Sequence, residues 1–282
     1  METLSGIFLD RAGTTAFERV LMERKTALIT GASGGVGFEL AHLFAKDGYD
    51  LVLVARNEDR LAKAAARLES QYGISAVTFA CDLAKAEASQ SVFAFTEMHQ
   101  IEVDALVNNA GFGYDAVFTE SDLDRQHDLL QVNNMVLMEL CLLYGEQMAK
   151  RGHGEILNIA SMAGFMPGAY MATYYASKAF VQSFSQALHS ELAGHGVRVT
   201  ALCPGPLRTN FWRAADADKT VLGNMLANPA RVAGAGYRAL KRNKPLCIPW
   251  IFPRIVVFLV RFLPYRFVTW CTKLIQNPRQ QH

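Results

Sequence analysis

The chain has 282 residues, of which 51% are hydrophobic and 19% are charged. This composition supplies a substantial core and excludes a disordered protein, a collagen and a small disulfide-rich protein. The net charge of +2 hides an asymmetry, because no Asp or Glu follows Asp218 while residues 219–282 contain eleven Lys or Arg. That segment carries +11 and the preceding residues carry −9, which favours an anionic partner at the C-terminal end: a membrane surface, an acyl carrier or nucleic acid.

The sequence predicts neither secretion nor a metal site. The five cysteines lie at least 24 residues apart, so we expect no zinc site and no disulfides, and a reducing compartment fits. The seven histidines are scattered and show no ligand pattern. The first apolar run, 7–9, is too short for a signal peptide. We therefore expect a cytoplasmic protein, not secreted, with a peripheral location at a membrane left open.

Apolar runs of strand length alternate with amphipathic runs of helix length along most of the chain. This alternation predicts an α/β fold, a doubly wound parallel sheet flanked by helices in a single domain. The predicted strands are 26–30, 51–55, 76–80, 105–108, 155–160, 198–203 and 247–249. The clearest predicted helices are 38–46, the segment after the N-cap Asn57, 174–192 and the segment from Pro229 to about 243.

The predicted domain, 24–250, has an extension at each end. In the N-terminal extension, 1–23, Thr15 and Glu18 have capping-box spacing and predict a short helix. The C-terminal tail, 251–282, is basic and amphipathic, and Pro264 divides it into two short helices. Prolines and cations interrupt the apolar stretch 246–275, whereas a membrane span needs about 20 largely uncharged residues.

The first predicted strand runs directly into the glycine-rich loop 30–37, Thr-Gly-Ala-Ser-Gly-Gly-Val-Gly, and a predicted helix follows. Between a strand and a helix, backbone N–H groups and the positive end of the helix can face a pyrophosphate. This context favours dinucleotide binding over a simple turn. The Gly-x-x-x-Gly-x-Gly spacing resembles the short-chain dehydrogenase/reductase family. The resemblance implies a Rossmann-type fold and cofactor contacts from Gly31, Ser33, Gly34, Gly35, Val36 and Gly37.

The end of the second strand indicates which cofactor binds. Where the family's NAD enzymes are expected to hold the ribose with an acidic residue, this chain has Ala55 followed by Arg56. An arginine can pair with the 2′-phosphate of NADP, so NADP(H) is the predicted cofactor, the alternative being a solvated surface arginine. The resemblance also implies cofactor contacts from Asp82, Leu83, Asn109, Ala110 and Gly111. Asp82 has an alternative reading as the N-cap of the next helix.

The segment 174–178 predicts carbonyl reduction. Tyr174 and Lys178 are four residues apart on a predicted helix and so share one face, where an ammonium can lower the pKa of a phenol that donates a proton. The resemblance implies that Ser161 orients the carbonyl and that Asn133 serves the proton relay, with Asn134 as a neighbouring candidate. Tyr174 and Lys178 are also expected to touch the cofactor, and Tyr175 to pack or contact substrate.

A Pro-Gly loop follows the sixth strand. The resemblance implies that this loop covers the nicotinamide through Pro204, Gly205, Leu207 and Thr209. Aromatic and methionine side chains nearby predict a pocket for a large apolar ligand: Phe112, Met162, Phe165, Met171, Phe211 and Trp212. The segment 210–226 lacks periodicity and is expected to form a lid.

These features predict an NADPH-dependent oxidoreductase that reduces the carbonyl of a lipophilic substrate, such as a 3-oxoacyl thioester or a steroid, as a homo-oligomer. The alternative is a catalytically idle NADP-binding scaffold that docks through its basic tail. The tail, 254–275, is predicted to bind an anionic membrane, to pack on another subunit or to cover the substrate mouth. Nucleic-acid binding is not expected, because the tail is too apolar for a solvated basic arm.

Overall fold

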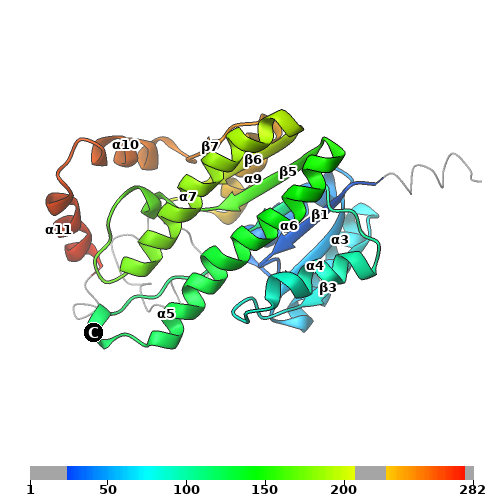
Figure 1. Cartoon of the computed structure of the whole chain (residues 1–282), viewed down its shortest axis with the longest axis horizontal. Coiled ribbons are helices and arrows are strands. Elements are labelled where there is room, and N and C mark those ends of the chain that lie inside the picture. Colours follow the sequence, from blue (N-terminus) through cyan, green and yellow to red (C-terminus); the bar gives the residue numbers. More distant parts are fainter. Residues whose placement is uncertain (1–23, 207–226, 277–282) are drawn as a thin grey trace, which may run out of the picture.

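The computed structural model describes residues 24–206 and 227–276, which form a central parallel sheet with helices on both faces (Figure 1). The strand order is β3-β2-β1-β4-β5-β6-β7, and every neighbouring pair is parallel. The strands are Thr26–Thr30 (β1), Asp50–Ala55 (β2), Ala76–Ala80 (β3), Ala105–Asn108 (β4), Gly154–Ile159 (β5), Val197–Leu202 (β6) and Leu246–Cys247 (β7). The prediction of a Rossmann-type doubly wound sheet is therefore confirmed.

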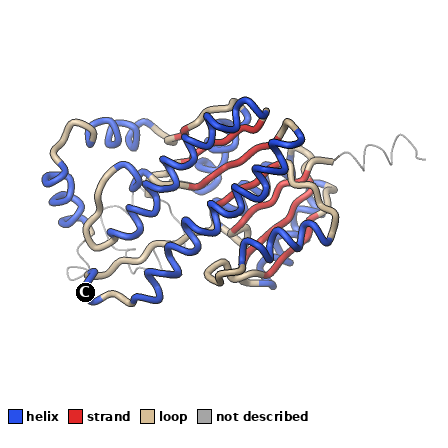
Figure 2. The backbone as a smooth tube through the Cα atoms, viewed as in Figure 1, coloured by secondary structure: helices blue, strands red, loops and turns tan. Residues whose placement is uncertain are grey.

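Two hydrophobic clusters lie on opposite faces of the sheet, because neighbouring strand residues point in opposite directions. Ile29 belongs to one cluster and Leu28 to the other. The Ile29 face is covered by Gly35–Lys46 (α2), Glu58–Tyr72 (α3) and Pro229–Lys241 (α9). The Leu28 face is covered by Ala88–Met98 (α4), Val136–Arg151 (α6) and Ala172–Leu192 (α7). Figure 2 shows the strands lying between these helices.

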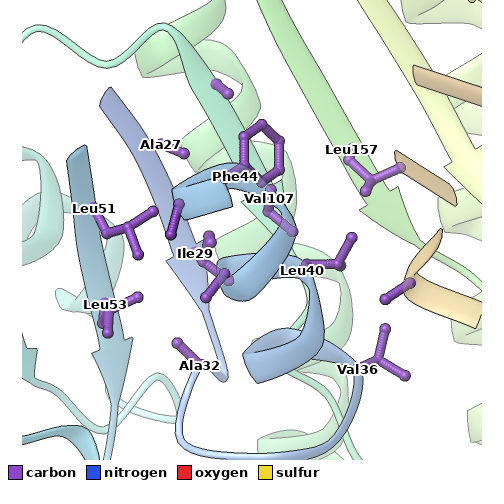
Figure 3. Close-up of a cluster of buried hydrophobic side chains, with 14 of the residues drawn as sticks. Ala27, Ile29, Ala32, Val36, Leu40, Phe44, Leu51, Leu53, Val107 and Leu157 are labelled. Atoms are coloured by element: carbon purple, nitrogen blue, oxygen red, sulfur yellow. The ribbon is translucent and has the colours of Figure 1, made fainter. Parts of the chain in front are cut away.

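Helix α2 packs directly over β1. Its side chains Val36, Leu40 and Phe44 follow helical spacing and point at the strands (Figure 3). Leu40 and Phe44 are fully buried. This packing holds the start of α2 beside the end of β1, which is the position of the glycine-rich loop.

The predicted strands agree with the observed ones to within about a residue at most ends, apart from 247–249, of which only Cys247 is in β7. Helix α2 begins at Gly35, three residues before the prediction, and α7 begins at Ala172 instead of Tyr174. Helices α4, α6 and Leu123–Leu130 (α5) were not predicted from the sequence. The predicted helix near Thr15 lies outside the described residues.

The short elements are the 3₁₀ turns Phe118–Glu120 (η1), Met162–Phe165 (η3) and Ala193–His195 (η4) and the π-helical turn Gln131–Met135 (η2). The chain ends in two further helices, Ile251–Val260 (α10) and Tyr265–Ile275 (α11), separated at Pro264 as predicted. Both lie at the side of the molecule toward which the strands point (Figure 1). In the part of the chain that the structure describes, no helix is both long and apolar enough to cross a bilayer.

Candidate active site

The connection after β1 leads to β2 on one side, and the connection after the neighbouring strand β4 leads to β5 on the other side, so the two connections run in opposite directions. In doubly wound sheets this reversal opens a crevice where ligands bind. The loops after β1, β4, β5 and β6 all meet at this end of the sheet. They carry the glycine-rich loop, Asn109, Ser161 and Pro204, which the sequence places far apart.

The glycine-rich loop needs glycine at both of its ends. Gly31 has a φ of +66°, and a Cβ there would lie 2.7 Å from Asn109 Nδ2. A Cβ on Gly37 would collide with the carbonyl oxygen of Gly31. Gly34, by contrast, has open space around its Cβ position and is exposed at the start of α2. With no acidic residue in the first turn of α2, this end of the helix fits a pyrophosphate.

The loop after β4 is fastened to the glycine-rich loop. The amide of Asn109 donates to the carbonyl oxygens of Thr30 (3.0 Å) and Gly31 (3.1 Å). The Thr30 hydroxyl accepts from the backbone N–H groups of Asn109 and Ala110, both at 3.0 Å. Asn109 and Ala110 thus fix the shape of the glycine-rich loop.

Arg56 follows the last residue of β2, at the same edge as the glycine-rich loop, and is exposed. No described residue forms a hydrogen bond or ion pair with its side chain, so its guanidinium is available to an anion. Asp82 lies beyond β3, where its carboxylate accepts from the N–H of Ala84 at 3.2 Å. Its alternative reading as a helix N-cap is wrong, because α4 begins six residues later, behind Glu87. Leu83 is buried in the Leu28-side core.

Ser161, Tyr174 and Lys178 come together beyond the end of β5. The side chains of Ser161 and Tyr174 are hydrogen-bonded. Lys178 is one turn along α7, with its Nζ 5.9 Å from the centre of the Tyr174 ring and donating to the carbonyl oxygen of Ile159 at 2.9 Å. The spacing of Tyr174 and Lys178 thus sets both on one helix face, as predicted.

Burial sets the ionisation of this pair. It raises the pKa of Tyr174 to about 12, partly offset by the Ser161 hydrogen bond, and lowers the pKa of Lys178 to about 8. Desolvation is the main cause of the Tyr174 shift and Lys178 is not among its causes, so the lowering of the Tyr174 pKa by Lys178 stays a prediction. At neutral pH, Tyr174 is a protonated phenol and most Lys178 is charged.

A π-helical turn inserts an extra residue before α6 and places Asn133 in the site. The Asn133 amide accepts from the N–H of Phe112 (3.1 Å) and donates to the Phe112 carbonyl (3.0 Å) and the Ser177 hydroxyl (3.1 Å). A Cβ on Gly111 would lie 2.8 Å from Asn133 Oδ1 and 3.3 Å from Lys178 Nζ. Asn133 and Lys178 therefore flank the same point of the backbone.

The neighbouring Asn134 lies elsewhere, donating at 2.9 Å to the carbonyl oxygen of Ser177 in α7. Ser177 thus accepts a hydrogen bond from each asparagine, through its hydroxyl from Asn133 and through its carbonyl oxygen from Asn134. This role of Ser177 was not predicted from the sequence. The position of Ser177 one residue before Lys178, on the face of α7 turned toward η2, was the available signal.

The loop after β6 is bonded to the segment after Ser161. The N–H of Met162 donates to the carbonyl oxygen of Pro204 at 2.9 Å. Pro204 is buried and Gly205 is half-buried. Four predicted site residues, together with the predicted lid 210–226, lie outside the described residues: Leu207, Thr209, Phe211 and Trp212.

The four described pocket residues differ in exposure. Phe112 and Met162 are half-buried near the site. Phe165 packs against the Leu28-side core, and Met171 is buried immediately before α7. Tyr175 packs beside Gly168 and accepts a hydrogen bond from Gln276 of the C-terminal segment. These are packing contacts within the protein, and the substrate contact expected as the alternative stays a prediction.

One group of candidate metal ligands, Glu102, Asp104 and His153, lies at the amino ends of β4 and β5, away from this site. Arg151 pairs with Glu102 at 3.4 Å. Asp104 accepts from the N–H of Thr26 at 2.8 Å. These bonds account for both carboxylates without an ion.

The family model described as short chain dehydrogenase matches residues 25–220. Very-long-chain 3-oxoacyl-CoA reductase of Phaeosphaeria nodorum is 40% identical over 177 residues, 61% of this chain and 52% of that protein. Probable oxidoreductase EphD of Mycobacterium tuberculosis is 32% identical over 238 residues, 77% of this chain and 40% of that protein. The chain thus spans about half the length of the curated relatives that it matches.

Solved structures share this fold over most of the chain. A short-chain dehydrogenase from Sphingobium yanoikuyae in complex with NADPH has a TM-score of 0.77 and 31% identity, covering 84% of this chain and 92% of that one. The bulky-bulky ketone specific alcohol dehydrogenase from Comamonas testosteroni has a TM-score of 0.73 and 28% identity, with the same coverage.

Proposed function

The chain belongs to the short chain dehydrogenase family, and we propose that it uses NADPH to reduce the carbonyl group of a lipophilic substrate to an alcohol. The observation that carries this proposal is the grouping of Ser161, Tyr174 and Lys178 at the carboxyl end of the sheet, next to the glycine-rich loop. A proton donor, its hydrogen-bond partner and a buried cation are what carbonyl reduction requires.

NADP(H) is the cofactor, which supplies the hydride when it is bound. The crevice fits it in two respects. Gly34 leaves room for a pyrophosphate at the start of α2, and Arg56 offers an exposed guanidinium to a 2′-phosphate. The S. yanoikuyae dehydrogenase, in complex with NADPH, supports this choice.

Tyr174 acts as the general acid. Because burial raises its pKa to about 12, it keeps its proton at neutral pH and gives it to the substrate oxygen only as negative charge develops there. Ser161, which is hydrogen-bonded to Tyr174 in this structure, turns its hydroxyl hydrogen to the same substrate oxygen when the substrate is bound. Lys178 stabilises the phenolate that remains, since an ammonium in a buried site interacts strongly with a nearby anion. Asn133 holds the Gly111–Phe112 backbone beside Lys178 and lies on the route that returns a proton to Tyr174.

The substrate is a lipophilic ketone or a 3-oxoacyl thioester. Half-buried Phe112 and Met162 adjoin the site and offer apolar contacts to such a molecule. The similarity to very-long-chain 3-oxoacyl-CoA reductases favours the acyl thioester within this class. The idle-scaffold alternative is not favoured, because the proposed catalytic side chains are all present and grouped.

The test is NADPH oxidation by the purified protein with long-chain 3-oxoacyl thioesters, bulky ketones and steroids, with Tyr174→Phe as the matched variant. Removing the proton donor should lower the turnover rate by roughly 10²–10⁴-fold while NADPH binding, measured by fluorescence, is unchanged. Full activity in the variant would remove Tyr174 from the mechanism. Tight NADPH binding without turnover of any compound would favour the scaffold.

A further inference from the structure

The two C-terminal helices turn their large apolar side chains outward. Of the twenty large hydrophobic side chains that are exposed in the described ranges, twelve belong to α10, α11 and their connection. We call these twelve the outer face: Ile251, Phe252, Ile255, Phe258, Leu259, Phe262, Leu263, Tyr265, Phe267, Trp270, Leu274 and Ile275. Isolated exposed hydrophobic residues are ordinary, but a concentration of this kind marks an interaction surface.

The opposite faces of α10 and α11 pack against the rest of the protein through a few side chains. Val257 and Val260 of α10 and Val268 of α11 are buried against the molecule. Helix α10 contacts η3, the turn that follows Ser161. Its Pro253 lies against the Pro-Gly loop, where a Cβ on Gly205 would be 3.2 Å from the proline ring.

Helix α11 is bonded to the loop between η3 and α7. The Thr272 hydroxyl accepts from the N–H of Ala169 (3.4 Å), and its hydrogen is shared between the carbonyl oxygens of Pro167 (3.3 Å) and Thr269 (3.0 Å). Gln276 bonds the hydroxyl of Tyr175, the residue next to Tyr174. Both helices are therefore attached to the loops around the proposed active site, and the outer face points away from that attachment.

The charges of this segment indicate what binds the outer face. Arg254, Arg261, Arg266 and Lys273 are exposed among the apolar side chains, and residues 251–276 contain no acid. A symmetric contact between two copies of this face would bring eight cations together without a carboxylate, which is unfavourable. A bilayer with anionic headgroups suits both the cations and the apolar side chains of this face. The cations bind the headgroups, and the apolar side chains enter the lipid. Trp270, paired with Phe267 at 5.9 Å, suits the interfacial layer.

We propose that the outer face of α10 and α11 docks on an anionic phospholipid bilayer and holds the entrance of the active site against the lipid. The first part of this inference, docking on the bilayer, depends only on the exposed apolar side chains and cations of the outer face. The second part, that docking holds the entrance of the active site against the lipid, rests on the proposed function, because it requires a lipophilic substrate that reaches Tyr174 from the membrane.

Vesicle flotation of the full-length protein tests the docking. Vesicles of phosphatidylcholine with about 30% phosphatidylglycerol should carry the protein, and phosphatidylcholine alone should carry much less. Trp270→Asp and Phe258→Asp should each weaken binding about tenfold or more, because each puts an anion into the lipid-facing surface. The control is Met98→Asp, which changes an apolar side chain that is more exposed than Trp270 or Phe258 and is the last residue of α4, before the loop that leads to the amino end of β4. Its binding should equal that of the wild type, and near-UV circular dichroism checks that each variant is folded.

Failure to bind either vesicle, or equal binding by Trp270→Asp, would overturn the docking. If the chain instead forms dimers that Phe258→Asp dissociates, the outer face is a subunit interface and the inference is wrong. NADPH oxidation separates the two parts. Trp270→Asp should keep the rate with a short water-soluble ketone and lose about tenfold with a long-chain 3-oxoacyl thioester presented in vesicles. Vesicle binding without any NADPH oxidation would uphold the docking and overturn the proposed function, and with it the second part of the inference.

Discussion

The Nζ atom of Lys178 lies 5.9 Å from the centre of the Tyr174 ring and is bonded to the carbonyl oxygen of Ile159. One donor of the lysine is therefore used by the backbone, and its charge lies beside the phenol ring. The lysine supplies a positive charge that becomes important when Tyr174 loses its proton. This arrangement separates two properties that the sequence pattern combined, the acidity of the phenol and the stabilisation of the phenolate.

The pH dependence of reduction should follow from the charge of Lys178. The cation predominates below its pKa of about 8 and is lost above it, so the turnover rate should be high near pH 7 and fall as the pH rises past about 8. Lys178→Arg should move this fall to higher pH, because a guanidinium keeps its proton throughout. Steady-state rates between about pH 6 and pH 10 measure the effect. An unchanged profile in the folded Arg variant would mean that another group titrates.

Arg56→Ala should weaken the binding of NADPH more than the binding of NADH. A charge-assisted bond to a phosphate contributes roughly 1.5–3 kcal/mol, so the KM for NADPH should rise about 10- to 100-fold while the KM for NADH stays near its wild-type value. Lys63→Ala is the matched control, since it removes an exposed cation from α3 at a greater distance along the chain from the glycine-rich loop. Equal losses for both cofactors would show that Arg56 has no role in selecting NADPH.

Alanine at two glycines should distinguish folding from cofactor binding. Gly37→Ala places a Cβ against the Gly31 carbonyl and 2.5 Å from Asn109 Nδ2, so it should lower the stability by about 1–3 kcal/mol. Gly34→Ala meets nothing within 4 Å and should leave the unfolding temperature nearly unchanged while weakening NADPH binding. Thermal unfolding and NADPH titration measure the two effects. Wild-type stability in Gly37→Ala would contradict the close approach of the two glycines.

Replacing Asn133 or Asn134 by Ala should change the stability and the turnover rate to different extents. Asn133→Ala removes both bonds to the Phe112 backbone in a buried site, so we expect a loss of roughly 2–3 kcal/mol and a lower turnover rate. Asn134→Ala removes one bond to a helix carbonyl and should cost about 1 kcal/mol with little change in turnover. Chemical denaturation and NADPH oxidation provide the comparison. The reverse order of the two turnover rates would assign the relay to Asn134.

The tail illustrates what a linear pattern leaves open. Its basic and apolar composition predicted a membrane contact, a subunit contact or a cover over the substrate mouth, and all three use the same residues. In the structure, Val257, Val260 and Val268 pack inward while the aromatic side chains face outward. Deleting 254–282 would therefore also remove buried packing, which makes surface variants such as Trp270→Asp the cleaner test.

The alternation of apolar strands and amphipathic helices by itself determined the parallel sheet, because the period of apolar residues decides which face of an element is buried. The spacings within the glycine-rich loop and from Tyr174 to Lys178 likewise determined local geometry, since each covers only a few consecutive residues. Only the tertiary structure decided the surroundings of those groups. The high pKa of Tyr174, the bond from Lys178 to Ile159 and the bond from Gln276 to Tyr175 join residues up to 101 positions apart. Desolvation and long-range contacts of this kind depend on how the loops meet at the end of the sheet, which no local pattern records.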